Sequence, residues 1–176
     1  MHNFVMQPRR LTMSNEILFD RHKAWMDRSI ELAVQAGEQG EIPVGAVIVS
    51  ADDRILGVGE NRKERDLDPT AHAEIVAIRA ATKASKDWHL TGCRLYVTLE
   101  PCPMCAGAIV QARIKTLIYG ADDPKTGAIR TVLNLPDSPA SFHKLIVIAG
   151  IRESECQELI QSWFQQRRLK NSAQKS

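Results

Sequence analysis

The chain has 176 residues, of which 44% are hydrophobic and 25% are charged, and its formal net charge is +2 at pH 7. This composition is typical of one globular domain with a sizeable core, and it excludes a disordered or fibrous protein. No apolar stretch approaches the roughly 20 residues that a membrane-spanning helix needs. Because the net charge is small, binding to a polyanion would have to depend on local basic patches.

We expect residues 1–20 to form a poorly ordered amino-terminal extension. This segment contains Arg9 and Asp20 and lacks the apolar core of a secretory signal. The domain itself is expected over residues 21–170, and a polar basic tail is expected over residues 171–176.

Hydrophobic periodicity and turn residues predict the order of helices and strands along the domain. The expected elements are a helix that ends at Gly37 and Gly40, a hairpin of strands over 44–49 and 55–58, a helix over 71–84, a strand over 94–99, a helix over 102–113, strands over 116–119 and 145–149, and a final helix. From residue 94 onward, strands alternate with helices. The sequence therefore predicts an α/β fold, a three-layer α/β/α sandwich with a central mixed sheet of about five strands.

The final helix combines an apolar face with a basic end. Its apolar residues recur at steps of three and four, which predicts one face buried against the sheet; they are Cys156, Leu159, Ile160, Trp163 and Phe164. Beyond them, Arg167, Arg168, Lys170 and Lys175 follow without any acidic residue. Such a basic end is typical either of a solvated tail or of an arm that binds a polyanion, and the sequence leaves both interpretations open.

His72, Cys102 and Cys105 are the candidate metal ligands. A turn before His72 marks the start of one helix, and Pro103 lies in the first turn of the helix that carries both cysteines. Cysteines three residues apart share a helix face, and a helix amino terminus favours the thiolate. Two thiolates and one imidazole would hold zinc with one open position, which is the arrangement of catalytic zinc sites.

Glu74 follows His72 by two residues and is the candidate catalytic base. Zinc lowers the pKa of a bound water to roughly 7, but two thiolates weaken this effect, so that a nearby group has to take the proton. In mid-helix, residues two apart diverge. At the first turn of a helix, however, Glu74 and His72 can both point to a site beyond the helix end.

Each part of this motif also has a simpler interpretation. A Cys-x-x-Cys pair occurs in redox sites and in structural zinc sites, and a single histidine is often a hydrogen-bonded core residue. A closed structural site would need a fourth ligand, but none of the remaining candidates has a partner at ligand spacing; they are Cys93, Cys156, His22, His89 and His143. The combination is more specific than its parts. Four cysteines, two of which form a group with His72, indicate a metal site in a reducing compartment and not a disulfide framework.

The motifs His-x-Glu at residues 72–74 and Pro-Cys-x-x-Cys at residues 101–105 resemble those of the zinc-dependent nucleotide and nucleobase deaminase superfamily. Further segments are similar to bacterial tRNA-specific adenosine deaminases, namely residues 43–47, 61–62, 68–75, 96–108, 120 and 123–128. The resemblance runs from about residue 24 to residue 168 and implies a cytidine deaminase-like fold. Cytidine and deoxycytidylate deaminases would share the zinc site, but not the Asp-x-Lys-Thr-Gly loop or the basic last helix.

The resemblance implies that the protein is a zinc-dependent tRNA adenosine deaminase. The expected reaction is hydrolytic deamination of adenosine to inosine at the wobble position of a tRNA anticodon, on an arginine tRNA, by attack of zinc-bound hydroxide on C6 with Glu74 as proton shuttle. The resemblance also implies one zinc ion per subunit, a homodimer and a cytoplasmic enzyme. The partner would be an anticodon stem-loop, and no membrane is expected.

The expected substrate contacts lie in three parts of the chain. Asn61 and the backbone amide of Ala73 are expected at the base, and the resemblance implies further contacts from Asp123 and Lys125 in the loop beside it and from Phe164, Arg167 and Arg168 on the last helix. An asparagine that stabilises a turn explains Asn61 equally well.

Two other classes of function remain. A free nucleobase or nucleotide deaminase of the guanine or cytosine type would have the same metal site, and its basic tail would be incidental. A non-catalytic RNA-binding subunit stabilised by zinc would have no need for Glu74.

Overall fold

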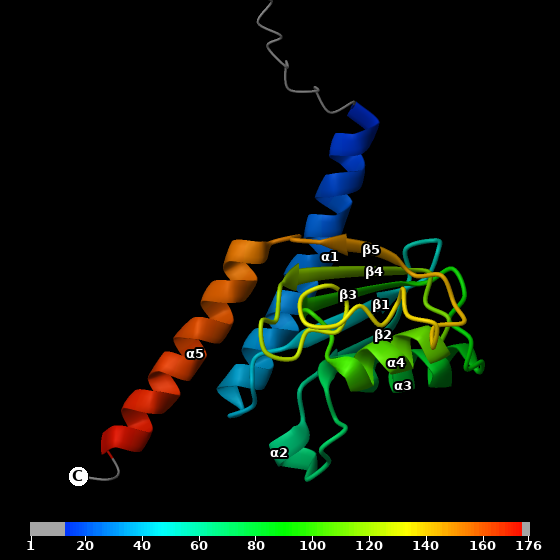
Figure 1. Ribbon diagram of the computed structural model, residues 1–176. Helices are drawn as coiled ribbons and strands as arrows, with labels where there is room; N and C mark the ends of the chain where they lie inside the picture. The colour runs from blue at the N-terminus through cyan, green and yellow to red at the C-terminus, as the bar shows by residue number, and fades with distance from the viewer. Residues whose placement is uncertain (1–12, 174–176) are drawn as a thin grey trace, which may run out of the picture.

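A mixed sheet with the strand order β2-β1-β3-β4-β5 organises the computed structural model, which describes residues 13–173 (Figure 1). The strands are β1 (Gly45–Val49), β2 (Ile55–Glu60), β3 (Arg94–Leu99), β4 (Thr116–Ala121) and β5 (Ile146–Ala149). Strand β1 pairs antiparallel with both β2 and β3, whereas β3, β4 and β5 are parallel. The predicted mixed α/β sheet is thereby confirmed.

Helices cover both faces of the sheet (Figure 1). They are α1 (Met13–Glu38), α2 (Lys63–Asp66), α3 (Ala73–Ser85), α4 (Pro103–Gln111) and α5 (Glu153–Ala173). Helices α3 and α4 lie on one face, and α1 and α5 lie on the other. Strands β3 to β5 and helices α3 and α4 lie within two residues of the bounds expected from the sequence, since each has a clear local start signal. None of the helices in residues 13–173 is long and apolar enough to cross a membrane.

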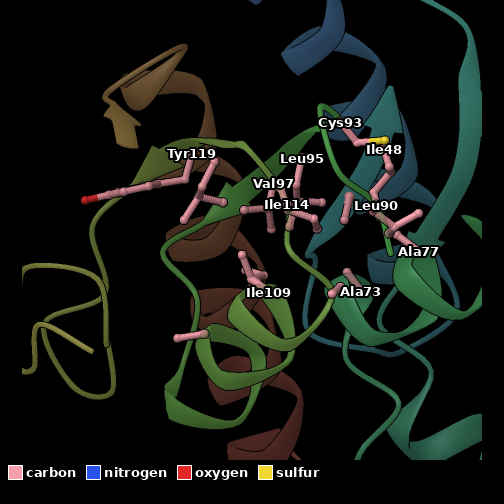
Figure 2. Packing of buried hydrophobic residues seen from close by; sticks show 14 of the residues in the cluster. Ile48, Ala73, Ala77, Leu90, Cys93, Leu95, Val97, Ile109, Ile114 and Tyr119 are labelled. Atoms are coloured by element: carbon pink, nitrogen blue, oxygen red, sulfur yellow. The ribbon is translucent and has the colours of Figure 1, made fainter. Parts of the chain in front are cut away.

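Alternate residues of the strands supply two separate cores. In β3, Leu95 and Val97 point to the α3 and α4 face, where they pack with Ala77 and Ile109 (Figure 2). Tyr96 points to the other face and packs there with residues of α1 and α5, including Met26 and Cys156. The central strands are buried on both faces, which explains their nearly continuous apolar sequence.

Two parts of the chain differ from expectation, and two others lie outside the described residues. Residues 13–20, expected to belong to a poorly ordered extension, form the first turns of α1 because no proline or glycine interrupts the helix there. The short helix α2 was not predicted. The expected extension before residue 13 and the end of the tail at residues 174–176 lie outside the described residues.

The apolar face of α5 is less buried than its sequence predicts. Cys156 is fully buried, Trp163 is half-buried, and Phe164 is 40% exposed. With 21 residues, α5 is about 31 Å long, whereas the six residues of β4 span about 20 Å. Only the first part of the helix can therefore cover the sheet, and its basic end projects beyond it (Figure 1).

Glycines in β2 let the first turns of α3 lie directly on the sheet. A Cβ atom at Gly59 would overlap the carbonyl oxygen of Ala73 and would lie 2.6 Å from the amide nitrogen of Ala77. Gly57 makes the same kind of approach to Ala81. This close packing fixes the height of the amino end of α3 above the sheet.

We expect Gly59→Ala to lower the free energy of unfolding by about 1–3 kcal/mol, because the added methyl group has to push α3 away from β2. Urea unfolding followed by circular dichroism would measure this change. Gly107→Ala in α4 is a matched control: no described atom lies within 4 Å of its added Cβ, and alanine should stabilise the helix by about 0.5–1 kcal/mol. A Gly59→Ala variant as stable as the native protein would contradict the close approach.

Candidate active site

The three predicted metal ligands converge at the amino ends of two helices. His72 is the N-cap of α3, Cys102 is the N-cap of α4, and Cys105 lies in the first turn of α4. Their ligand atoms all lie within 4.8 Å of one another. The structure thus brings together residues that are separated by about thirty positions in the chain.

The spacing of the donor atoms fits a tetrahedral metal ion. His72 Nδ1 lies 3.7 Å from Cys102 Sγ and 3.5 Å from Cys105 Sγ. Standard zinc bond lengths and a tetrahedral angle predict about 3.6 Å between a nitrogen and a sulfur ligand. These residues can therefore hold a zinc ion with little rearrangement.

Among residues 13–173, no fourth side chain joins this group of ligands. The other candidates have different partners. His22 Nδ1 lies 3.0 Å from the Tyr96 hydroxyl, and His143 Nε2 lies 2.7 Å from the carbonyl oxygen of Ile114. A set of three protein ligands leaves one position for water or substrate, as in catalytic zinc sites.

Glu74 lies in the first turn of α3 with only 4% of its surface exposed. Burial raises the pKa of this carboxyl to about 7, and the negative charge of Cys102 adds to the increase, whereas its own backbone amide and His72 oppose it. A carboxyl with a pKa near neutrality can both accept and release a proton at physiological pH. A bound cation would lower this pKa.

The two cysteines differ in protonation: the pKa of Cys102 favours the thiolate, whereas that of Cys105 favours the thiol. The hydrogen bond from the Cys105 thiol lowers the pKa of Cys102 to about 4, and the same bond, together with burial, raises the pKa of Cys105. The hydrogen bond with Cys102 raises the pKa of His72, while burial and the charge of Lys63 lower it. A dication that binds all three side chains has to displace these protons, so its affinity should fall with decreasing pH.

A cavity of about 150 Å³ opens onto His72, Glu74 and Cys102. Its other lining residues come from four separate segments, and they are Ile42, Val44, Asn61, Lys63, Leu99, Glu100, Asp123 and Thr126. The predicted site residues Asn61 and Asp123 therefore lie beside the metal ligands.

Asn61 connects two segments that form the wall of this cavity. Its side-chain amide donates to the carbonyl oxygen of Ile42 at 3.0 Å, and its Oδ1 accepts from the amide of Ala73 at 3.1 Å. Asn61 thus positions the start of α3. The amide of Ala73, expected to donate to the substrate, already has an acceptor, so a substrate would have to compete with Asn61 for it.

Asp123 shapes the loop beside the cavity. Its carboxylate accepts from the amide of Lys125 at 2.9 Å, from the amide of Thr126 at 3.2 Å and from the Thr126 hydroxyl at 2.6 Å. These bonds close the loop on itself and leave the Lys125 side chain exposed.

Glu100 is a site residue that the sequence reasoning missed. It is 2% exposed, and its carboxylate accepts from the amides of Asp123 at 3.1 Å and Arg130 at 2.8 Å, and also from the Thr131 hydroxyl. Burial alone would raise the pKa of Glu100, but these hydrogen bonds outweigh it and lower the pKa. An acidic residue at the end of a buried strand, directly before Pro101, was the available signal.

The predicted contacts on α5 line a separate groove of about 340 Å³. Phe164, Arg167 and Arg168 form one wall, and Arg167 donates to the carbonyl oxygen of Gly40 at 3.1 Å. The groove shares Ile42, Asn61 and Lys63 with the cavity at the metal ligands. We refer to these two spaces as the α5 groove and the active-site cavity.

Known proteins match this chain over most of its length. The family model described as MafB19-like deaminase matches residues 20–168. The tRNA-specific adenosine deaminase of Haemophilus influenzae is 45% identical over 151 residues, which are 86% of this chain and 87% of that protein. The chain therefore belongs to the MafB19-like deaminase family.

Two solved deaminase structures extend the comparison. One comes from a study of A-to-I editing by tRNA:A34 deaminases at the wobble position of transfer RNA; it is 45% identical, has a TM-score of 0.75, and covers 77% of this chain and 98% of the other. The other is the guanine deaminase of Bacillus subtilis, which is 38% identical with a TM-score of 0.56 and covers 71% of this chain and 82% of the other. The cytidine deaminase-like fold expected for this deaminase is thereby confirmed.

We expect the pH dependence of stability of the zinc-free deaminase to report the burial of Glu74. Its folded-state pKa of about 7 lies above the ordinary value of 4.5, so its stabilising contribution is complete below pH 4.5 and is lost as the pH rises through 7. Between pH 5 and 8, the native protein should therefore lose up to about 3 kcal/mol relative to Glu74→Gln.

Urea unfolding of both proteins, in a chelator and a thiol reductant, would measure this difference. A constant difference between the two stabilities across that range would mean that Glu74 is ionised without cost in the folded state.

Proposed function

We propose that this protein is a tRNA adenosine deaminase that hydrolyses the wobble adenosine of an anticodon, in an arginine tRNA, to inosine. One observation carries the proposal: a buried Glu74 carboxyl lies beside three side chains spaced for a zinc ion, in a chain similar to tRNA-specific adenosine deaminases. We propose one zinc ion per subunit, held by His72, Cys102 and Cys105.

Zinc in this site would supply an activated water at neutral pH, as a nucleophile for C6 of the adenine. Glu74 would take a proton from this water and deliver it to ring N1, and would then carry the proton of the hydroxyl group added at C6 to the departing amine, which leaves as ammonia. Burial raises the pKa of Glu74 and so opposes the lowering by a bound cation, which suits a carboxyl that has to act both as base and as acid.

The substrate-binding part of the proposal depends on the surface around the active-site cavity. Single-stranded RNA loops present bases that can be turned out and stacked on aromatic side chains, and an anticodon loop is of this kind. Phe164, Arg167 and Arg168 line a groove that joins the cavity, which supports a role for all three in RNA binding. We assign Asn61, Ala73, Asp123 and Lys125 to the wall around the base.

The other functional classes have less support. A free-base deaminase such as a guanine deaminase would need the cavity but would have no use for a basic groove beside it. A non-catalytic RNA-binding subunit would gain nothing from Glu74, whose burial opposes ionisation. A tRNA deaminase uses both features, and we propose that it acts in the cytoplasm, where thiol ligands stay reduced.

Zinc-loaded protein should convert adenosine to inosine in an anticodon stem-loop, but should leave free adenosine, cytidine and guanine unchanged. Glu74→Gln should retain zinc and lose at least about a hundredfold in kcat, since it removes the proton carrier. Cys102→Ser should lose zinc, whereas Cys93→Ser, altered in the core away from the site, should keep it.

Product chromatography and metal analysis by mass spectrometry would measure these effects. Guanine turnover without inosine in the RNA would replace this proposal with a free-base deaminase.

We further propose a homodimer. Exposed apolar side chains lie on α4 and on the loop between β4 and β5, namely Met104, Val132, Leu133 and Phe142, which are 37%, 51%, 51% and 59% exposed. A second chain that covered these side chains would remove their apolar surface from water, which supports the homodimer.

Size-exclusion chromatography with light scattering should give twice the chain mass of 19.6 kDa, and Phe142→Glu together with Leu133→Glu should reduce it to one chain. A native protein that is monomeric at micromolar concentration would contradict the homodimer.

A further inference from the structure

Lys63 lies where the active-site cavity meets the α5 groove. Its side chain lines both spaces, beside His72 and Glu74 in the first and beside Arg167 and Arg168 in the second. It is half-buried, and it forms no ion pair with any residue in the described part of the chain. Its neighbours differ in this respect, because Arg62 and Arg65 are each paired with a carboxylate.

The backbone around Lys63 is held in place by buried side chains. Glu41, which is 2% exposed, accepts from the amide of Arg65 at 2.9 Å and from the amide of Glu64 at 3.3 Å. The amide of Arg62 donates to the carbonyl oxygen of Ala71 at 3.0 Å. Lys63 is therefore presented from a fixed turn, and only its four-carbon stem is free to move.

The charges on the α5 groove side of this junction favour an anion. Lys63, Arg167 and Arg168 contribute three cations to the α5 groove, whereas its acidic residues are Glu41 and Glu64. Both carboxylates keep their negative charge, but Glu41 is held by two backbone amides and Glu64 is exposed to solvent, so the three cations leave the groove with a net positive charge. A lysine ammonium without a carboxylate partner, partly removed from water, is suited to hold a phosphate as a point charge.

We propose that Lys63 is a substrate-binding residue, which holds the phosphodiester between the target adenosine and the adjacent nucleotide as the RNA passes from the active-site cavity into the α5 groove. The inference rests on the proposed function and adds the route of the RNA strand to it. Glu41 acts through Lys63 as a positioning residue. The target base would occupy the cavity, and the neighbouring nucleotide would lie against Phe164 and Arg168 in the groove.

The test compares Lys63→Ala, Lys63→Arg and the native protein, all zinc-loaded, on an anticodon stem-loop. Lys63→Ala should raise KM about 3- to 10-fold with kcat unchanged, because a phosphate contact away from the reacting atoms binds ground and transition states equally. The slope of log KM against log salt should decrease by about 0.7, the value for one phosphate of a single strand. Lys63→Arg should restore most of the affinity.

The control is Lys83→Ala. Lys83 is an exposed lysine in the last turn of α3, and it lines neither the active-site cavity nor the α5 groove. Lys83→Ala should match the native protein in KM and in salt slope. Circular dichroism and zinc content of each variant would show that the fold and the metal site are intact. Glu41→Gln should raise KM in the native background, but much less in the Lys63→Ala background.

A second substrate series identifies the phosphate itself. Two stem-loops each carry a single neutral methylphosphonate linkage, one on the 5′ side and one on the 3′ side of the target adenosine, and their KM values should differ. One of them should raise the KM of the native protein but not that of Lys63→Ala, since the contact is already lost. The role of Lys63 would be overturned if the loss from each neutral linkage added to the loss from Lys63→Ala, or if Lys63→Ala left KM and the salt slope unchanged. In either case, inosine formation by the native protein would leave the proposed function standing. Absence of inosine from every RNA with the native protein would overturn the proposed function itself.

Discussion

The meeting of two helix amino ends above one edge of the sheet is the constraint on which the site depends. His72 and Cys102 are both N-caps, so their backbones leave the helical conformation where the ligand atoms must turn toward each other. The height of α3 is set by its contact with the glycines of β2, and α4 follows β3 after three residues. A shift of either helix by about one ångström would spoil spacings that fit a tetrahedral ion.

Three buried glutamates show how the surroundings of a carboxyl decide its role. Glu41 and Glu100 each accept hydrogen bonds from backbone amides of a segment distant in sequence, α2 for Glu41 and the loop after β4 for Glu100, and each holds that segment in place. Glu74 is buried to a similar degree without such a set of amides, and burial raises its pKa, whereas hydrogen bonds lower the pKa of Glu100. Proton transfer to a substrate requires a carboxyl like that of Glu74, because a carboxylate whose oxygens accept hydrogen bonds from backbone amides stays ionised and holds no proton to give.

The two faces of the sheet carry the two parts of the proposed function, the candidate metal site on one and the proposed RNA-binding helix on the other. The face covered by α3 and α4 carries the ligands, whereas α5, from the other face, projects its basic end past the edge where the ligands lie (Figure 1). The loop before β1 and the segment at Asn61 and Lys63 connect the two, since they line both the active-site cavity and the α5 groove. An extended substrate could thus reach the reacting centre and the basic helix together, which a small base could not do.

The sequence by itself predicted the candidate metal ligands and the candidate proton carrier, and it determined the order of the strands and of the longer helices, because each of these depends on local signals such as helix starts, cysteine spacing and strand periodicity. Only the tertiary structure decided what depends on contacts between distant segments. It revealed Glu100 as the residue that ties the Asp123 loop to the end of β3, and it gave Asn61 a structural role at Ala73. It also exposed Phe164, although its helical spacing predicts burial, because α5 is longer than the sheet that it covers. Periodicity specifies which face of a helix is apolar, but the length of the neighbouring strands decides how much of that face finds a partner.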